Sequence, residues 1–162
     1  MTVTFETLQR DPTVLYGACG GLWVMILHAP PTKAGMLLAR PALESMVRRI
    51  PSGFSTLTWI LGSAGFRMDG DARTAAADVT RAFEPQILAQ ATLVEGEGFQ
   101  TAAVRAILTG LDAMSGSAKP KRVFSTLTEA VAWSTTRPDV TVRAPTNEIV
   151  EALSAVRTGL GG

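Results

Sequence analysis

The sequence has few of the residue types that build covalent cross-links and metal sites. It holds one cysteine, Cys19, and one histidine, His28, among 162 residues. A single cysteine excludes an internal disulfide bond. One histidine and one cysteine are too few for a metal cluster unless carboxylates supply the other ligands. We therefore expect no metal, no cofactor, a reducing cytoplasm as the location, and Cys19 as a small buried hydrophobic residue.

Neither sign of charge dominates, and no apolar run is long. The formal net charge is +1, and the densest basic cluster, Lys119, Lys121 and Arg122, is short, so nucleic-acid binding is not favoured. The longest apolar stretch, residues 20–31, is too short to span a bilayer. Because Glu6 and other charged residues precede it, we also expect no signal peptide.

The composition is that of one globular domain, with 46% hydrophobic and 18% charged residues. Its first thirty residues predict three strands without a helix between them, which favours an antiparallel meander. The turn signals are Arg10-Asp11-Pro12 and Gly20-Gly21. The expected strands cover residues 3–8, 13–19 and 22–28.

Helical and strand patterns alternate from residue 32 onward. This order favours an α/β fold with a mixed sheet of about six strands, an antiparallel meander followed by alternating β-α units, and a C-terminal helix. Pro41 either kinks or splits the first helix. The expected strands cover residues 55–61, 91–94 and 121–125; the expected helices cover 33–50, 71–84, a segment from Phe99, a segment capped by Thr126 or Thr128, and 147–158.

The turn Gly96-Glu97-Gly98 has the beginning of a dinucleotide-binding fingerprint. The third glycine of that fingerprint is replaced by Thr101. Glu95 and Glu97 would also repel a pyrophosphate. We therefore interpret these residues as a plain turn from strand to helix.

The order of elements resembles the STAS domain, the fold of anti-sigma-factor antagonists and of the wider SpoIIAA-like group. Residues 55–61 (STLTWIL), the loop ending in FRMDGDA and the next helix are similar to the STAS strand–loop–helix, and residues 121–133 (KRVFSTLTEAVAW) are similar to the family's F-x-x-x-x-E-A ending. The resemblance implies a STAS/SpoIIAA-like domain over residues 1–137, with a linker and C-terminal helix over 138–162. It also implies a bacterial signalling or scaffolding module that docks on a partner protein.

The STAS loop usually carries an aspartate followed by the phosphorylated serine. If Asp69 matches that aspartate, Gly70 stands in place of the serine and cannot accept a phosphate. The resemblance therefore implies docking without the usual phospho-switch, and Ser63 is a possible phosphorylation site in the same loop. The alternative is that these residues are a solvated helix start and its cap. The predicted partner-binding residues are Arg67, Asp69, Asp71 and Arg73.

Two other functions compete with docking. A small-molecule or lipid-binding domain is suggested by the mean hydropathy of +0.21 and by methionine and tryptophan residues that suit an apolar pocket between sheet and helices, although core packing is the simpler explanation. An enzyme would need Asp69 with Asp71, or Glu95 with Glu97 at a strand end. The apolar-pocket candidates are Trp23, Met25, Met36, Met46, Trp59 and Met68.

A Ser-His-Asp site would have to use His28, and no nucleophile–base pair is readable, so we expect no enzymatic activity. The last helix carries an apolar side formed by Ile149, Leu153 and Val156, which must cover the chain's own sheet or a second copy. We expect a homodimer.

Overall fold

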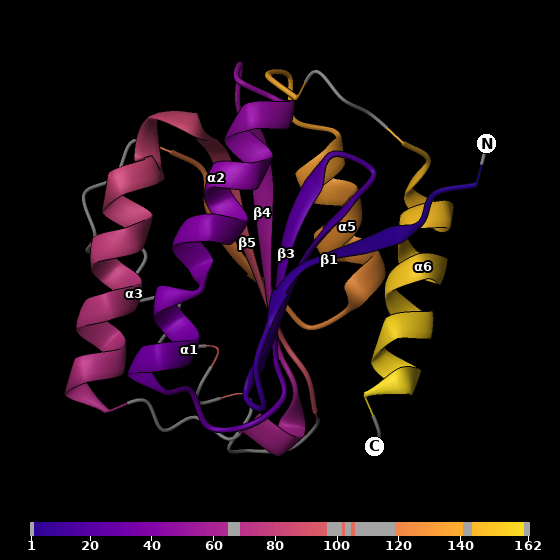
Figure 1. Cartoon of the computed structure of the whole chain (residues 1–162). Coiled ribbons are helices and arrows are strands. Elements are labelled where there is room, and N and C mark those ends of the chain that lie inside the picture. The colour runs from indigo at the N-terminus through magenta and orange to yellow at the C-terminus, as the bar shows by residue number, and fades with distance from the viewer. Residues whose placement is uncertain are drawn as a thin grey trace.

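The computed structural model describes residues 2–64, 69–96, 102, 105, 119–140 and 144–160. In this part of the chain six strands form one mixed sheet in the order β1-β2-β3-β4-β5-β6 (Figure 1). The first three strands are antiparallel, and β3 to β6 are parallel. The predicted α/β fold, with a leading meander, is confirmed. The strands are β1 (Phe5–Arg10), β2 (Val14–Cys19), β3 (Leu22–Leu27), β4 (Phe54–Ile60), β5 (Ile87–Val94) and β6 (Lys121–Phe124).

Five helices and two 3₁₀ turns are described. The helix predicted from Phe99 falls almost entirely on residues 97–101, 103–104 and 106–118, which lie outside the described residues. The helices are α1 (Lys33–Leu37), α2 (Ala39–Arg49), α3 (Gly70–Phe83), α5 (Leu127–Thr135) and α6 (Thr146–Gly159); the turns are η1 (Gly62–Ala64) and η2 (Glu84–Gln86).

Of the two outcomes left open for the helix predicted over residues 33–50, a kink or a split, the structure shows the split, which falls at Leu38. Pro41 occupies the first turn of α2, where a missing N–H costs no intrahelical hydrogen bond. Strand β5 also begins earlier than predicted, at Ile87. Its residues alternate between buried and partly exposed from Ile87 to Thr92, so period-2 burial extends back to the 3₁₀ turn that contains Pro85.

The turns of the meander follow from local chemistry. The Oδ1 atom of Asp11 accepts hydrogen bonds from the backbone N–H groups of Thr13 and Val14, which closes the turn between β1 and β2. Gly20 and Gly21 both have positive φ, at 58° and 85°. That backbone is the one that a two-residue hairpin between β2 and β3 requires.

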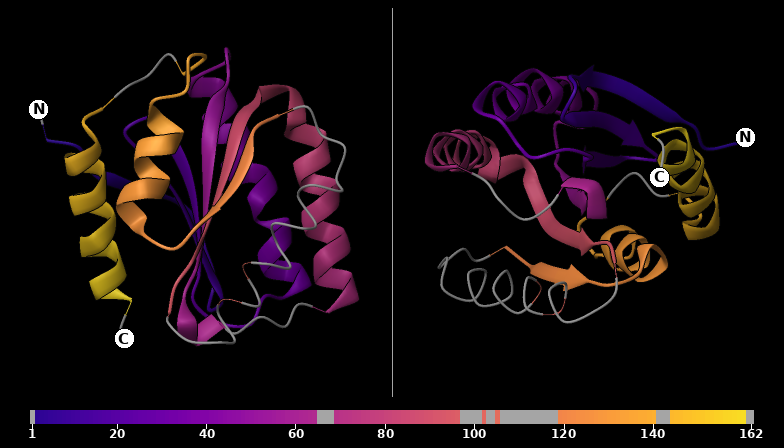
Figure 2. Two further views of the ribbon diagram at one scale, coloured as in Figure 1. Left: turned by 180° about the vertical axis from the view of Figure 1, so that it is seen from behind. Right: turned by 90° about the horizontal axis from the view of Figure 1, so that it is seen from below.

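Helices cover both faces of the sheet, as the two views of Figure 2 show. On one face, here the α1–α3 face, Tyr16, Trp23 and Phe54 pack in a cluster with residues of α1, α2 and α3. On the other, the α5–α6 face, strand residues such as Val24 and Leu57 pack with α5 and α6. Because side chains alternate along a strand, the two clusters are separate layers of the core.

The C-terminal helix covers the chain's own sheet. Ile149 and Leu153 are fully buried in the cluster of the α5–α6 face, which also holds Cys19 and Leu22. Burial raises the pKa of the Cys19 thiol to about 11, so the thiol is protonated at neutral pH and packs as a hydrophobic group. The homodimer stays a prediction.

Candidate functional site

A groove lies between α1, the start of α2 and α3 on the α1–α3 face. Its volume is about 350 Å³. We call it the α1–α3 groove. Figure 1 shows the helices that form it side by side on one face of the sheet. The groove is lined by Lys33, Leu37 and Arg40 from α1 and α2, and by Asp71, Thr74, Ala75, Asp78 and Val79 from α3.

An exposed apolar side chain stands in this groove. Leu37 is 47% exposed and is the large hydrophobic residue left exposed among those the structure describes. Ala75 and Val79 lie opposite it and are buried. Because alanine and valine are short, α3 approaches α1 without filling the space beside Leu37.

The two walls of the groove carry opposite charges. Lys33 and Arg40 belong to the α1–α2 wall, and Asp71 and Asp78 belong to the α3 wall. Asp78 also pairs with Arg81 one turn along α3, at 3.3 Å between exposed side chains, a geometry that contributes little stability. The α1–α2 wall of the groove is therefore basic, the α3 wall is acidic, and both walls also carry apolar side chains.

The structure separates the predicted partner-binding residues. Asp69 is the N-cap of α3, and its Oδ1 atom accepts a hydrogen bond of 2.8 Å from the backbone N–H of Ala72, which satisfies a donor at the helix start. Asp71 lines the groove. Arg73 is exposed two residues later, about 200° around the helix from Asp71. Arg67 lies outside the described residues.

Ser63 lies in η1, directly after β4, and its phosphorylation stays a prediction. The cap on Asp69 agrees with the alternative interpretation of that residue as a helix start. Position 71 had been expected to begin the helix, whereas α3 begins at Gly70 with Asp69 before it. Of the four predicted contacts, the groove thus favours Asp71.

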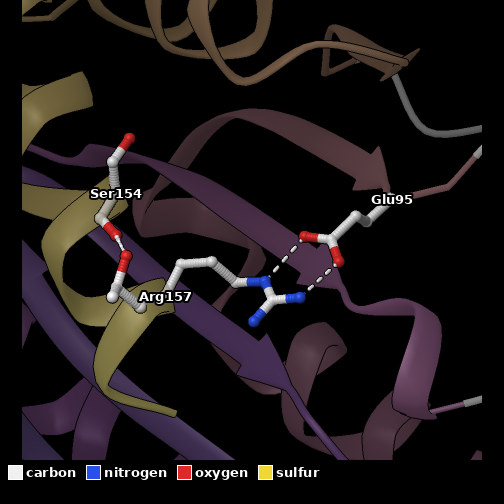
Figure 3. A network of polar contacts seen from close by, with 4 residues as sticks. Glu95, Ser154 and Arg157 are labelled. Carbon is white, nitrogen blue, oxygen red and sulfur yellow. Dashed lines mark hydrogen bonds and ion pairs between the residues drawn. The ribbon is translucent and has the colours of Figure 1, made fainter. Parts of the chain in front are cut away.

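An ion pair joins the carboxyl end of β5 to the last turn of α6 (Figure 3). The Nε and Nη2 atoms of Arg157 donate to the two carboxylate oxygens of Glu95 at 2.8 and 2.7 Å. The side chains are 25% and 31% exposed, respectively. A bidentate geometry of this kind is stronger than a single-contact surface pair.

The hydrogen bonds from Arg157 lower the pKa of Glu95, against an opposing effect of burial. The backbone N–H of Gly62 and the indole of Trp59 lower the pKa of Glu95 further. The geometry of the Trp59 Nε1 atom is nevertheless too poor to count as a hydrogen bond. Both carboxylate oxygens accept from Arg157, so Glu95 connects the end of β5 to α6. Glu97, its predicted partner in an enzyme, lies outside the described residues.

His28 is the histidine that a Ser-His-Asp site would use, and it lies near Asp11 and Thr13. The hydroxyl of Thr13 donates to the Asp11 carboxylate at 2.7 Å. Burial would raise the pKa of Asp11, but the hydrogen bonds from Thr13 and Val14 outweigh it and the net pKa is lowered. Burial lowers the pKa of His28, and the charge of Asp11 opposes this. The hydroxyl of Thr13 and the carboxylate of Asp11 thus take part in the turn between β1 and β2.

No group of three or more His, Cys, Asp or Glu side chains in the described ranges could hold a metal ion. Among the helices that the structure describes, none is long and apolar enough to cross a membrane.

A small cavity lies beneath the helices of the α1–α3 face. Its volume is about 60 Å³, and we call it the inner cavity. Trp23 and Met25 form part of its floor and Met36 part of its roof, so three of the six methionine and tryptophan residues singled out from the sequence surround it. The indole Nε1 atom of Trp23 is buried and has no hydrogen-bond partner among the described residues.

Comparisons with known proteins identify one similar structure. No model of a known protein family and no curated protein matches the chain. The chain is similar to the crystal structure of an uncharacterized protein of the DUF3478 family, with a SpoIIAA-like fold, from Shewanella loihica PV-4. The identity is 12% and the TM-score 0.49, over 82% of this chain and 93% of the other. The fold named for that protein is the one that the sequence of this chain resembles, and the similarity bears on no ligand, partner or activity.

Proposed function

We propose that this protein is a non-enzymatic regulatory or scaffolding module that binds an amphipathic helix of a partner protein in the α1–α3 groove. The observation that carries the proposal is the exposed Leu37 between walls of opposite charge. An exposed apolar side chain in a concave site is the kind of anchor around which helices dock.

The shape and charge of the groove favour a helix as the partner element. Helix α1 and helix α3 pack side by side and leave a trough between them, and a third helix laid in such a trough buries its apolar stripe. Lys33 and Arg40 suit acidic residues on one side of that stripe, and Asp71 and Asp78 suit basic residues on the other. Such rim charges set orientation and association rate more than affinity.

The alternative function, a small-molecule or lipid-binding domain, has less support where it requires a ligand enclosed whole between sheet and helices. The inner cavity, at about 60 Å³, is far smaller than the roughly 300–1,000 Å³ of pockets that enclose drug-sized ligands. The α1–α3 groove is larger but is lined by four charged side chains. A lipid tail makes no favourable contact with charged side chains, whereas a helix with charged residues beside its apolar stripe can pair with them.

Site-specific photo-crosslinking tests the proposal in the protein's own host. A photoreactive amino acid at position 37 should form one discrete adduct with a partner protein. The same amino acid at Glu151, an exposed position of α6 on the opposite face, is the control and should form none. An adduct of twice the chain's mass would instead identify a second copy as the occupant and would overturn the proposal.

Affinity measurements with the captured partner then locate the contact. Leu37→Asp should weaken binding by about tenfold or more, as expected for an anchor residue. Asp71→Lys should slow association and weaken the salt dependence of the rate. Arg73→Glu changes a charge on the same helix but away from the groove, so it should bind as the wild type does. Equal losses in all three variants would contradict the groove as the docking site.

A further inference from the structure

The inner cavity has a polar floor within an otherwise apolar layer. Opposed residues of neighbouring strands point to the same face of a sheet. Trp23 opposes Thr56, and Thr56 opposes Gln90, so an indole N–H, a hydroxyl and an amide stand in one row across β3, β4 and β5. All three residues line the inner cavity. The strand register therefore assembles three hydrogen-bonding side chains at one place under the helices.

Of these three groups, the indole N–H of Trp23 is the buried donor that lacks a hydrogen-bond acceptor in the described part of the chain. Trp23 is 5% exposed, its ring packs 5.5 Å from that of Tyr16, and its Nε1 atom has no acceptor among the described residues. A buried N–H without an acceptor destabilises a fold. By contrast, the nearby Tyr16 hydroxyl donates to the backbone carbonyl of Gly35 at 2.8 Å. One donor of the two is satisfied, and the other needs an oxygen from elsewhere.

The lining selects the charge of any ligand. The described residues around the inner cavity include no acidic, basic or histidine side chain, and a buried charge without a partner is costly. The roof is apolar, formed by Met36, Leu43 and Ala76. The fitting group is therefore uncharged and carries an oxygen that accepts from Trp23.

The size of the cavity limits the group that enters it. A volume of about 60 Å³ exceeds the roughly 10–15 Å³ that one water molecule needs, so the few heavy atoms of a carboxamide can enter the cavity. The cavity is also not sealed, because Thr58 and Gln90 are partly exposed and Thr80 is exposed. The rest of a ligand has a way out past these residues.

We propose that the inner cavity is a binding site for the uncharged carboxamide or carbonyl head of a small molecule, whose oxygen accepts a hydrogen bond from the Trp23 indole N–H. The site lies under the helices of the α1–α3 face, whereas the docking groove lies between those helices. It is therefore independent of the proposed docking function, and either one stands if the other fails.

Nuclear magnetic resonance of the three indole N–H groups tests this proposal. The protein is titrated with acetamide, and with acetate as the charged probe of the same shape. Acetamide should move the Trp23 indole proton signal downfield in a saturable manner and leave those of Trp59 and Trp133 unmoved. Acetate should move none of them. An unmoved Trp23 signal, or equal shifts of all three with either probe, would overturn the proposal.

Two variants and one further signal sharpen the test. In Trp23→Phe, followed through the Met36 methyl signal, the affinity for acetamide should fall roughly 2- to 12-fold, which is the loss of one neutral hydrogen bond. Ala76→Leu fills the cavity from α3 and should abolish the Trp23 shift. If either variant fails to fold, the wild-type titration still decides. The indole proton of Trp23 could still contact water when acetamide is saturating. That result would mean that water, and not the carboxamide, occupies the cavity, and it would overturn the proposal.

Discussion

The two faces of the sheet differ in how completely they are closed. On the α5–α6 face, large aliphatic side chains such as Ile149 and Leu153 are fully buried, and a bidentate ion pair fastens the last turn of α6 to the end of β5. The α1–α3 face has an exposed leucine, a charged groove and a cavity between sheet and helices. Among the described residues, the first face is therefore closely packed, and the second leaves space between and beneath its helices.

The difference originates in side-chain size. Helix α3 presents Ala72, Ala75 and Val79 to its neighbours, whereas α6 presents Ile149 and Leu153. Small side chains let helices approach but leave space beside any larger residue, and buried aliphatic side chains fill that space. This difference in side-chain size is the reason that we place the proposed docking site on the α1–α3 face.

Truncating one leucine on each face tests whether the two faces differ in how tightly they are packed. Leu153→Ala should lower the free energy of unfolding by about 2–5 kcal/mol, since it leaves a cavity in a closed core. Leu37→Ala, on a side chain that is 47% exposed, should change it by less than about 0.5 kcal/mol. Urea denaturation of both variants measures the two values. Similar losses would mean that the faces are equally closed.

A second substitution probes how tightly α6 lies on the meander. Gly20 has a φ of +58°, and a Cβ atom there would lie 2.9 Å from the Cβ of Ala144 and 3.1 Å from Ile149. Left-handed backbone costs a non-glycine residue about 1–2 kcal/mol, and the contacts add to it. Gly20→Ala should therefore destabilise the fold by about 2 kcal/mol or more in thermal unfolding.

Gly62→Ala is its matched control, because a Cβ at Gly62 meets nothing within 4 Å. That variant should unfold as the wild type does, within about 0.5 kcal/mol. A Gly20→Ala protein of wild-type stability would show that α6 moves aside easily, and the contrast between the faces would weaken.

The smallest expected effect concerns the ion pair and depends on pH. Arg157 lowers the pKa of Glu95 from its ordinary value of 4.5, so the pair contributes stability above that value and loses it as the pH falls through the lowered pKa. Arg157→Gln should cost about 1 kcal/mol at neutral pH. Urea midpoints of the two proteins should converge in acid, and a constant difference at all pH values would contradict the electrostatic origin.

Much of the fold follows from local sequence. Alternation and glycine turns indicate the meander, and the threonine N-cap at Thr126, whose Oγ1 accepts from the N–H of Glu129, marks the start of α5. The breaks were harder to place. Pro41 left a kink and a split equally open, and the beginning of β5 at Ile87 depends on pairing with Phe54 of β4, which a single segment does not reveal.

The candidate sites depend on longer distances. Asp71 was singled out from the sequence, but its neighbours in the groove, Lys33 and Leu37, come from a helix more than thirty residues earlier. Nothing near Glu95 in the sequence indicates that Arg157 is its partner, since 62 residues separate them. Trp23 was noted as an apolar residue, and its N–H without an acceptor became visible only in the folded chain.

The sequence by itself determined the elements, the turns and the α/β class, because these follow from periodicity, glycine, proline and capping residues acting over a few positions. The tertiary structure alone decided which face is closed, where the α1–α3 groove runs and which polar groups meet beneath it. Those properties depend on how side chains from distant segments fill space together, and the local pattern of any one segment carries no information about what will pack against it.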